Sequence, residues 1–410
     1  MILKIAVVLS HIPYPLLKGE QVRAFNQMRI LSHEHDIYLF VVSDNKKIHP
    51  QALTELSKIT KSIEVFKLSA FSIFVNKIRA NLKGIPSICG RFFNARIKKQ
   101  LNEKLDDLKP DIIYNQLITT TEYTKDRKER KILDYQNVFS KDLWRFMEKT
   151  HKTKSKKYLK KYQRLQNYES TIFRYFDEKT IITQVDREWI HHHWSDQVVV
   201  VPNGVDMHYF YPQTNDKQYD IIFTGNMSYL PNVLACEYIV KEILPQLLKK
   251  YPKIRIVLCG VNPSSKVLAL KNSHVEVTGY VEDIRDYYAK SKLFLAPLEI
   301  GSGLQNKLLE AMAMKLPCIT SPLASEPLKA EANRDLLICN SVLGYVDEID
   351  NLIQKTNELD EFLRESPFGD SLKDYKSAHK VPVKVHSLPD WKKESAEKDP
   401  IEEFLNKFVR

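Results

Sequence analysis

Residues 292–320 read KLFLAPLEIGSGLQNKLLEAMAMKLPCIT. The apolar run at 292–298 is typical of a buried strand, and the residues after it carry apolar side chains at helical spacing. Gly301 and Gly303 stand between the two and are two of only 11 glycines in 410 residues. Glycine lets a ligand approach the backbone, and the first turn of a helix offers unpaired N–H groups to an anion. The segment therefore predicts a strand, a phosphate-binding loop and a helix.

The predicted helix has one polar face and one apolar face. Gly303, Lys307 and Glu310 share a face by helical spacing. A lysine in the first turn opposes the helix dipole unless an anion compensates it, and a diphosphate is such an anion. The Glu310 carboxylate could accept hydrogen bonds from the two hydroxyls of a ribose. The simpler alternative is a glycine-rich turn followed by a surface Lys–Glu pair.

Short β-branched runs alternate with helix-like segments along the chain, which favours parallel sheets covered on both faces. The first series of predicted strands comprises 2–10, 37–43, 111–116, 131–135, 179–184 and 198–203. The second comprises 219–225, 254–260, 275–280, 292–298 and 316–321. Because the pattern starts again, we expect an α/β protein with two doubly wound, Rossmann-like domains that face each other across a cleft.

We place the domains at 1–198 and 199–365. They are followed by a tail at 366–410, which is either a linker with a terminal helix that packs back on the first domain or a loosely ordered end. A length of 410 residues exceeds what one core normally supports. The N-terminal run MILKIAVVLS is too short to span a bilayer and lacks a basic leader, so we read it as the first strand rather than a signal peptide.

The five cysteines are isolated and form no CxxC pair, which indicates reduced thiols in a cytoplasmic protein and no zinc site. The three consecutive histidines at 191–193 point in different directions on a helix and have no partner carboxylate, so a surface position is favoured over a metal site. We expect no metal and no other cofactor.

The net charge of +11 is concentrated in the first half. Residues 1–200 hold 36 Lys and Arg against 22 Asp and Glu, and the stretch 149–164 holds eight basic residues and no acidic one. A solvated helix face is one interpretation, and an electrostatic contact with an anionic membrane surface or a phosphorylated acceptor is the other. Nucleic acid is disfavoured because no binding motif is present.

The stretch at 292–320 resembles the donor-binding segment of the retaining family-four glycosyltransferases, which have the GT-B fold. The resemblance extends over VVVVPNGVDMHYF (198–210), FTGNMSYLPN (223–232), VLCG (257–260) and VTGYVEDIRDYYAKSKLFLAPL (277–298). It covers most of 198–325 in the order of that family. A subgroup of exopolysaccharide sugar transferases has a similar lysine-containing helix.

The resemblance implies a nucleotide-diphosphate sugar as co-substrate. It assigns donor binding to eight residues besides Lys307, which are Gly225, Asn226, Tyr280, Val281, Ser302, Gly303, Leu304 and Glu310. Glu310 would bind the ribose, Tyr280 and Val281 would border the base, and Asn203 with Gly204 would form the interdomain crossover. Two features depart from the family: Ser302 replaces a glutamate, and NMSYLPN after the FTG strand lacks the usual Arg and Lys. Lys307 could supply the missing charge.

In the first domain, Gly19, Glu20 and Arg23 follow the first strand, and the resemblance implies that this loop faces the donor phosphates or the acceptor. A plain strand–helix connection is the alternative. Asp134 falls at the end of a strand, where it could contact a sugar or cap the next helix.

The resemblance implies a metal-independent hexosyltransferase-type glycosyltransferase that acts with retention on a glycan or lipid-linked acceptor in cell-surface polysaccharide synthesis. Lys307, Glu310 and Asp134 are the predicted catalytic residues. Lys307 would stabilise the charge of the diphosphate leaving group, whereas Glu310 would hold the ribose and Asp134 would contact a sugar. The location is cytoplasmic or peripheral on the inner face of the membrane. A nucleotide-sugar epimerase and a catalytically silent nucleotide-sugar-binding protein are the alternatives. A nicotinamide-dependent oxidoreductase is disfavoured because GxGxxG is absent after the first strand.

Overall fold

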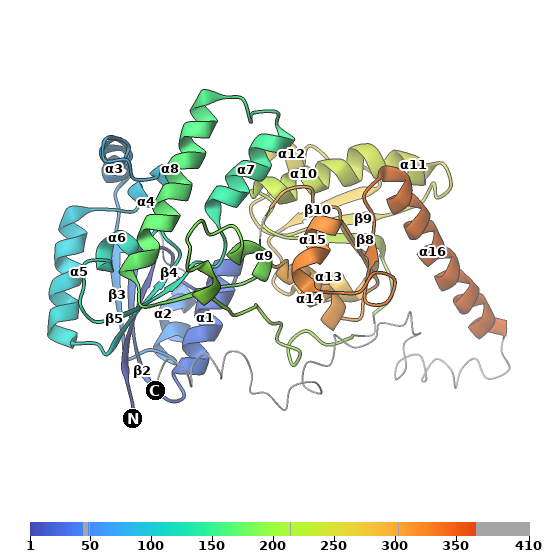
Figure 1. The fold of residues 1–410 in the computed structure, drawn as a ribbon. Coiled ribbons are helices and arrows are strands. Elements are labelled where there is room, and N and C mark those ends of the chain that lie inside the picture. Colours follow the sequence, from blue (N-terminus) through green and yellow to red (C-terminus); the bar gives the residue numbers. More distant parts are fainter. Residues whose placement is uncertain (44–47, 49, 214, 302, 366–410) are drawn as a thin grey trace. The chain divides into compact units, whose positions relative to one another are not determined.

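The computed structural model describes residues 1–43, 48, 50–213, 215–301 and 303–365, with side chains as far as 355. The chain divides into two compact units, one ending at Asn203 and the next beginning at Gly204. Figure 1 shows the first unit in blue to green and the second in yellow-green to red. The expected tail at 366–410, with its terminal helix, lies outside the described residues.

The first unit contains one parallel sheet of seven strands in the described residues, in the order β3-β2-β1-β4-β5-β6-β7. The strands are β1 (Lys4–Leu9), β2 (Asp36–Ser43), β3 (Ser62–Lys67), β4 (Ile112–Gln116), β5 (Arg130–Asp134), β6 (Glu178–Ile181) and β7 (Val199–Val200). Since β7 pairs with β6, the first unit extends five residues beyond the expected end at 198.

The helices of the first unit connect these strands (Figure 1). They are α1 (Gly19–Leu31), α2 (Pro50–Ser57), α3 (Ala70–Leu82), α4 (Ser87–Gly90), α5 (Ala95–Leu108), α6 (Thr121–Thr124), α7 (Phe139–Lys149), α8 (Lys156–Ile172) and α9 (Gln184–Arg187), with 3₁₀ turns at Phe173–Tyr175 and Ser195–Gln197.

Successive side chains of β1 enter different cores. Ile5 and Val7 belong to one buried cluster, whereas Ala6 and Val8 belong to another. This alternation is the period-two geometry of a strand that is buried on both faces, and it explains the continuous apolar run in the sequence.

The second unit contains a parallel sheet of six strands in the described residues, in the order β10-β9-β8-β11-β12-β13. The strands are β8 (Tyr219–Thr224), β9 (Ile256–Cys259), β10 (Val275–Gly279), β11 (Ser291–Ala296), β12 (Cys318–Thr320) and β13 (Leu337–Ile338). The helices are α10 (Leu230–Tyr238), a π-helical turn at Ile239–Ile243, α11 (Leu244–Leu248), α12 (Ser265–Leu268), α13 (Ile284–Ala289), α14 (Asn306–Ala313), α15 (Pro322–Ser325), a 3₁₀ turn at Glu326–Leu328, and α16 (Val342–Glu365).

In both sheets the strand order reverses in the middle while all strands stay parallel, which confirms two doubly wound, Rossmann-like units. The reversal lies between β1 and β4 in the first sheet and between β8 and β11 in the second. The loops that leave two such neighbouring strands run to opposite sides, and ligands of open α/β sheets bind in the crevice that this leaves. The second reversal is therefore the place to look for a donor site.

Candidate functional site

The loops that follow β8 and β11 contain most of the predicted donor residues. β8 and β11 pair in parallel, with Leu293 opposite Ile221. Gly225 and Asn226 follow the end of β8, and the loop from Pro297 to Gln305 connects β11 to α14. The tertiary structure thus brings two segments that are about 80 residues apart in sequence to one reversal point.

Glycine is required at two positions because the loop after β8 packs against both the loop after β9 and the start of α10. A Cβ atom on Gly260 would lie 1.8 Å from the carbonyl oxygen of Gly225, and a Cβ on Gly225 would lie 2.6 Å from the Asn232 side-chain nitrogen. Both contacts are shorter than atoms allow. The Gly225 N–H also donates to the Cys259 carbonyl at 3.1 Å. The two loops are therefore closely packed against each other beside the start of α10.

Lys307 lies in the first turn of α14, as the sequence predicts. Its ammonium group donates to the Asn232 side-chain oxygen and lies 4.9 Å from the ring centre of Phe223. Asn232 is itself held by a hydrogen bond to the carbonyl oxygen of Asn226 at 2.9 Å. Burial lowers the pKa of Lys307 to about 8. The lysine is thus anchored by one neutral amide and an aromatic ring, with no carboxylate within ion-pair distance among the described residues.

Glu310 lies one turn further along α14. Its Oε2 atom accepts a hydrogen bond from the Tyr288 hydroxyl at 2.9 Å, and that hydroxyl lies 2.8 Å from the Thr224 hydroxyl. Oε1 makes no hydrogen bond with the described residues. Burial raises the pKa of Glu310. The side chain is therefore oriented by one oxygen, while the other retains its capacity to accept a hydrogen bond from a ligand.

The remaining predicted donor residues lie around this pair. Gly303 has φ +71° and open space where a Cβ would stand, and Leu304 follows it, one residue before the N-cap residue Gln305 of α14. Tyr280 follows β10 and is 66% exposed, whereas Val281 packs against the core of the second unit. Ser302 lies outside the described residues.

Sequence reasoning did not find the residues that hold this pair, and it also missed an aromatic and cationic group nearby. The Arg285 guanidinium lies 4.0 Å from the ring centre of Tyr209, donates to the Tyr209 carbonyl at 3.1 Å, and pairs with Asp283. Burial, followed by the charge of Asp283, raises the pKa of Tyr209, and the charge of Glu310 contributes.

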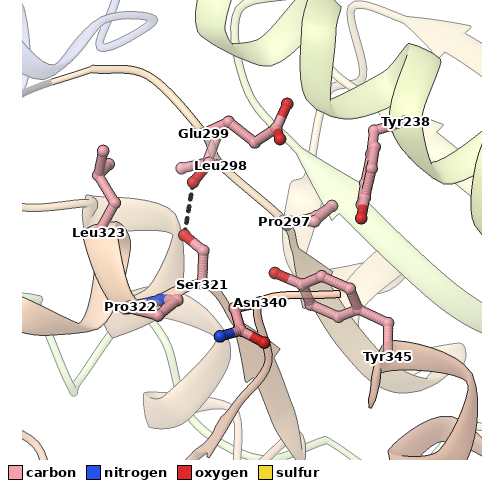
Figure 2. Close-up of a pocket in the computed structure, with 9 residues that line it drawn as sticks. All are labelled: Tyr238, Pro297, Leu298, Glu299, Ser321, Pro322, Leu323, Asn340 and Tyr345. Carbon is pink, nitrogen blue, oxygen red and sulfur yellow. Dashed lines mark hydrogen bonds between the residues drawn. The ribbon is translucent and has the colours of Figure 1, made fainter. Parts of the chain in front are cut away.

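A small cavity of about 240 Å³ adjoins the loop after β11 (Figure 2). Its lining comprises Tyr238, Pro297, Leu298, Glu299, Ser321, Pro322, Leu323, Asn340 and Tyr345. None of the predicted donor residues in the described ranges lines it. The Ser321 hydroxyl donates to the Leu298 carbonyl at 2.5 Å, so this side of the loop is fixed to the end of β12.

In the first unit, Arg23 and Asp134 form a buried ion pair. The Arg23 Nε and Nη2 atoms lie 2.6 and 3.2 Å from the Asp134 carboxylate, and Nη1 donates to the Val201 carbonyl and the Asn203 side chain, both at 2.9 Å. Asp134 is 0% exposed and Arg23 6%. Tyr114 also donates to Asp134, at 3.0 Å.

This arrangement corrects two interpretations. Asp134 is enclosed by protein groups and is not presented to a sugar, and Arg23 holds the end of the first unit in place of a ligand phosphate. Both charges are buried, where a charged partner compensates the loss of hydration. Gly19 begins α1, and the Glu20 carboxylate lies 3.8 Å from the Lys18 ammonium near the surface. Gly19 and Glu20 remain predicted contacts for an acceptor or a phosphate.

The described part of the chain presents neither a metal-binding cluster nor a helix that could span a membrane. No group of three or more His, Cys, Asp or Glu side chains there is arranged to hold a metal ion. His192 stacks on the Phe173 ring, with centres 4.0 Å apart. None of the helices in the described ranges combines the length and the apolar character that crossing a membrane requires.

Comparison with known proteins finds similar sequences and structures. Residues 218–355 match the family described as glycosyl transferases group 1. A protein of Klebsiella pneumoniae, named as an uncharacterized 44.6 kDa protein in the cps region, is 20% identical over 375 residues, which cover 85% of this chain and 90% of that protein.

Solved structures resemble the whole chain at low sequence identity. Sucrose-phosphate synthase from Thermosynechococcus elongatus has a TM-score of 0.62 at 11% identity and covers 86% of this chain and 90% of its own. HepE from Anabaena, solved in complex with UDP-glucose, has a TM-score of 0.60 at 14% identity, with 87% and 91% covered. TarM has a TM-score of 0.60 at 12% identity, with 100% and 98% covered. At such identities the likeness shows the fold.

The matched segment spans the second sheet from the residue before β8 into α16 and includes both Lys307 and Glu310. The chain thus has the GT-B fold, and its residues 218–355 match the glycosyl transferases group 1 family.

Proposed function

We propose that this protein transfers a sugar, with retention, from a nucleotide-diphosphate donor to a hydroxyl of a glycan or lipid-linked acceptor. The observation that carries the proposal is the position of Lys307 and Glu310 on one face of α14, at the reversal point of the second sheet. Lys307 is held there by Asn232 and Glu310 by Tyr288. A cation and a carboxylate on one helix face suit the diphosphate and the ribose of a nucleotide. HepE supports the donor class, since it is solved with UDP-glucose.

Lys307 has the properties that stabilisation of a diphosphate requires. Its ammonium uses one hydrogen bond on Asn232, which leaves donors for phosphate oxygens. The start of α14 adds the partial positive charge of the helix dipole. Such pre-oriented charge acts most strongly where negative charge develops, which in this reaction is the oxygen that leaves with the diphosphate.

The proposed step exchanges one bond at the anomeric carbon. The bond from this carbon to the diphosphate oxygen breaks, and a bond to the acceptor oxygen forms on the same face. The acceptor proton passes to the departing phosphate oxygen, so the products are the glycosylated acceptor and a nucleoside diphosphate. This route requires no protein nucleophile, and the burial of Asp134 removes it from the catalytic residues that we propose.

The role of Glu310 is donor binding and orientation. Glu310 stands three residues after Lys307 and shares its face of α14, so one nucleotide can engage both residues. Tyr280 and Val281, at the end of β10, are proposed to border the base. We further propose that Gly303 and Leu304 let the diphosphate or the donor sugar approach the start of α14.

The biological setting that we propose is synthesis of a cell-surface polysaccharide in the cytoplasm or at its membrane. The cps-region name of the Klebsiella pneumoniae relative supports it. The acceptor and the membrane contact belong to this proposal, with the basic stretch 149–164 in the first unit as the expected contact.

The test begins with a thermal-shift screen of nucleoside diphosphate sugars. The best donor is then incubated with and without candidate glycan and lipid-linked acceptors, and nucleoside diphosphate release is measured. Transfer requires release that depends on the acceptor, and proton NMR of the new linkage reports retention. A changed sugar without any acceptor would identify an epimerase, and binding without release or product would identify a silent binding protein.

A further inference from the structure

Helix α3 carries a row of large apolar side chains on its outer surface. Phe71, Phe74, Ile78 and Leu82 are 77%, 64%, 49% and 83% exposed. They stand at positions i, i+3, i+7 and i+11, which place them in one stripe along the helix. Such a contiguous apolar stripe is uncommon on the surface of a soluble protein and marks an interaction site.

The inner side of α3 is firmly attached, so the stripe is not the face that folding buries. Asn76 and Ala80 are buried, and Ala80 is packed so closely on α4 that a Cβ on Gly90 would lie 2.0 Å from its Cβ. Ser69 caps the start of α3 by accepting from the Ser72 N–H at 3.1 Å. The helix is therefore a rigid element that presents the stripe outward.

The charge around the stripe is positive. Residues 70–84 contain Lys77, Arg79 and Lys83 and no acidic residue. The end of α3 is joined to the basic helix α8 by a hydrogen bond from the Arg164 guanidinium to the Asn81 side chain, and the two helices lie near each other in Figure 1. Three exposed lysines of α8 stand three, four and seven residues before Arg164 and share its face; they are Lys161, Lys160 and Lys157. None of the three has an ion-pair partner in the described part of the chain.

We propose that the stripe of α3, flanked by the lysines of α8, is a docking surface for an anionic lipid membrane. Apolar side chains at the centre and cations at the edge match the boundary between acyl chains and negative headgroups. A helix of 13 residues is about 20 Å long, enough to lie flat in that boundary. An uncharged apolar partner or a second copy of this basic unit would leave these lysines uncompensated, which is why lipid is the favoured occupant.

The inference deepens the proposed function, since lipid-linked acceptors lie at such a surface, but vesicle binding can be measured without any transfer reaction. The full chain is sedimented with vesicles of phosphatidylcholine alone or mixed with phosphatidylglycerol, at low and high salt. Wild-type protein is expected to bind the mixed vesicles, and salt is expected to weaken the binding because it screens the lysines.

Two sets of variants separate the apolar and the electrostatic contributions. The double variant Phe71→Ser, Phe74→Ser is expected to lower partitioning at least about tenfold at both salt concentrations. Lys157→Gln with Lys160→Gln is expected to remove much of the salt-sensitive part. Leu53→Ser is the matched control, since Leu53 is 49% exposed on α2 of the same unit, and should bind as the wild type does.

Two results would overturn the inference. One is vesicle binding by the double phenylalanine variant that equals that of the wild type. The other is sedimentation velocity that shows a wild-type dimer which the double variant converts to a monomer, because the stripe would then be a protein interface. The thermal shift with the donor, measured on every variant, separates donor binding from membrane docking. Its absence in the wild type would refute the proposed function without bearing on membrane docking.

Discussion

Replacing Lys307 with methionine is expected to weaken donor binding while the fold gains stability. Methionine keeps most of the length of the side chain and removes the charge. At pH 7 the loss of charge-assisted hydrogen bonds to the diphosphate amounts to about 1.5–3 kcal/mol, or roughly 10- to 150-fold in affinity. In the protein without donor, the same substitution is expected to increase the stability of the fold.

The stability argument follows from the lowered pKa. The pKa of Lys307 is about 8 in the folded chain, because of burial, and its ordinary value is 10.5. Between these values the unfolded chain binds more protons than the folded chain, so this lysine's contribution to stability rises with pH. At pH 7 its protonation costs the fold at most about 3 kcal/mol. The variant removes this cost, although Asn232 loses its donor, which costs about 1–2 kcal/mol.

Donor affinity in the wild type is expected to fall with rising pH. A group with a pKa of about 8 is protonated to about nine-tenths at pH 7 and about one-tenth at pH 9. If only the protonated form binds the diphosphate, the dissociation constant rises about tenfold between these values. The Lys307→Met variant should bind weakly at both pH values and show no such change.

The assay is calorimetric titration with the nucleoside diphosphate that gives the largest thermal shift, at pH 7 and pH 9. Lys315→Met is the matched control, because Lys315 is exposed just beyond the end of α14. It should leave affinity, pH dependence and melting temperature unchanged. Equal affinity of wild type and Lys307→Met, with both proteins folded, would refute the role of Lys307 in holding the diphosphate.

Three further substitutions test other parts of the structure. Glu310→Gln should weaken nucleotide binding by about 1.5–3 kcal/mol. Because burial raises the pKa of Glu310, the affinity of the wild type should also fall as the pH drops through this raised pKa. A calorimetric affinity that does not change with pH in this range would count against ribose binding. Asp134→Asn should destabilise the first unit by about 3–5 kcal/mol in urea unfolding, because Arg23 is left buried without its charged partner. Donor binding should stay intact. Loss of sugar transfer at unchanged stability would instead restore a catalytic role for Asp134. Gly260→Ala should lower stability by more than about 2 kcal/mol and weaken donor binding, whereas Gly204→Ala, with no atom within 4 Å of its Cβ, should stay within about 0.5 kcal/mol by thermal unfolding.

Much of the fold could be predicted because buried parallel strands leave a strong local pattern. The eleven predicted strands all correspond to strands of the two sheets. The strand β3 was missed because it is an edge strand whose segment, SIEVFK, is only partly buried and carries charged residues such as Glu64. β13 was missed because it is only two residues long. Weak burial leaves little periodic signal in either segment.

The polar face of α14 could likewise be predicted, since Lys307 and Glu310 lie on one helix and their spacing alone determines that they share a face. The residues that hold them could not. Asn232 lies on α10 and Tyr288 on α13, and neither has a local pattern that distinguishes it from an ordinary helix residue.

The sequence by itself determined the two-sheet architecture, the glycine loop and the face of the helix that carries the donor residues, because each depends on the spacing of neighbouring residues. Only the tertiary structure decided which distant charges meet. Arg23 and Asp134 are 111 residues apart and neutralise each other inside the first unit, while Lys307 has a neutral amide and a ring beside it. A buried charge must find compensation, and only the packed chain shows whether a protein group supplies it or the site is left for a ligand.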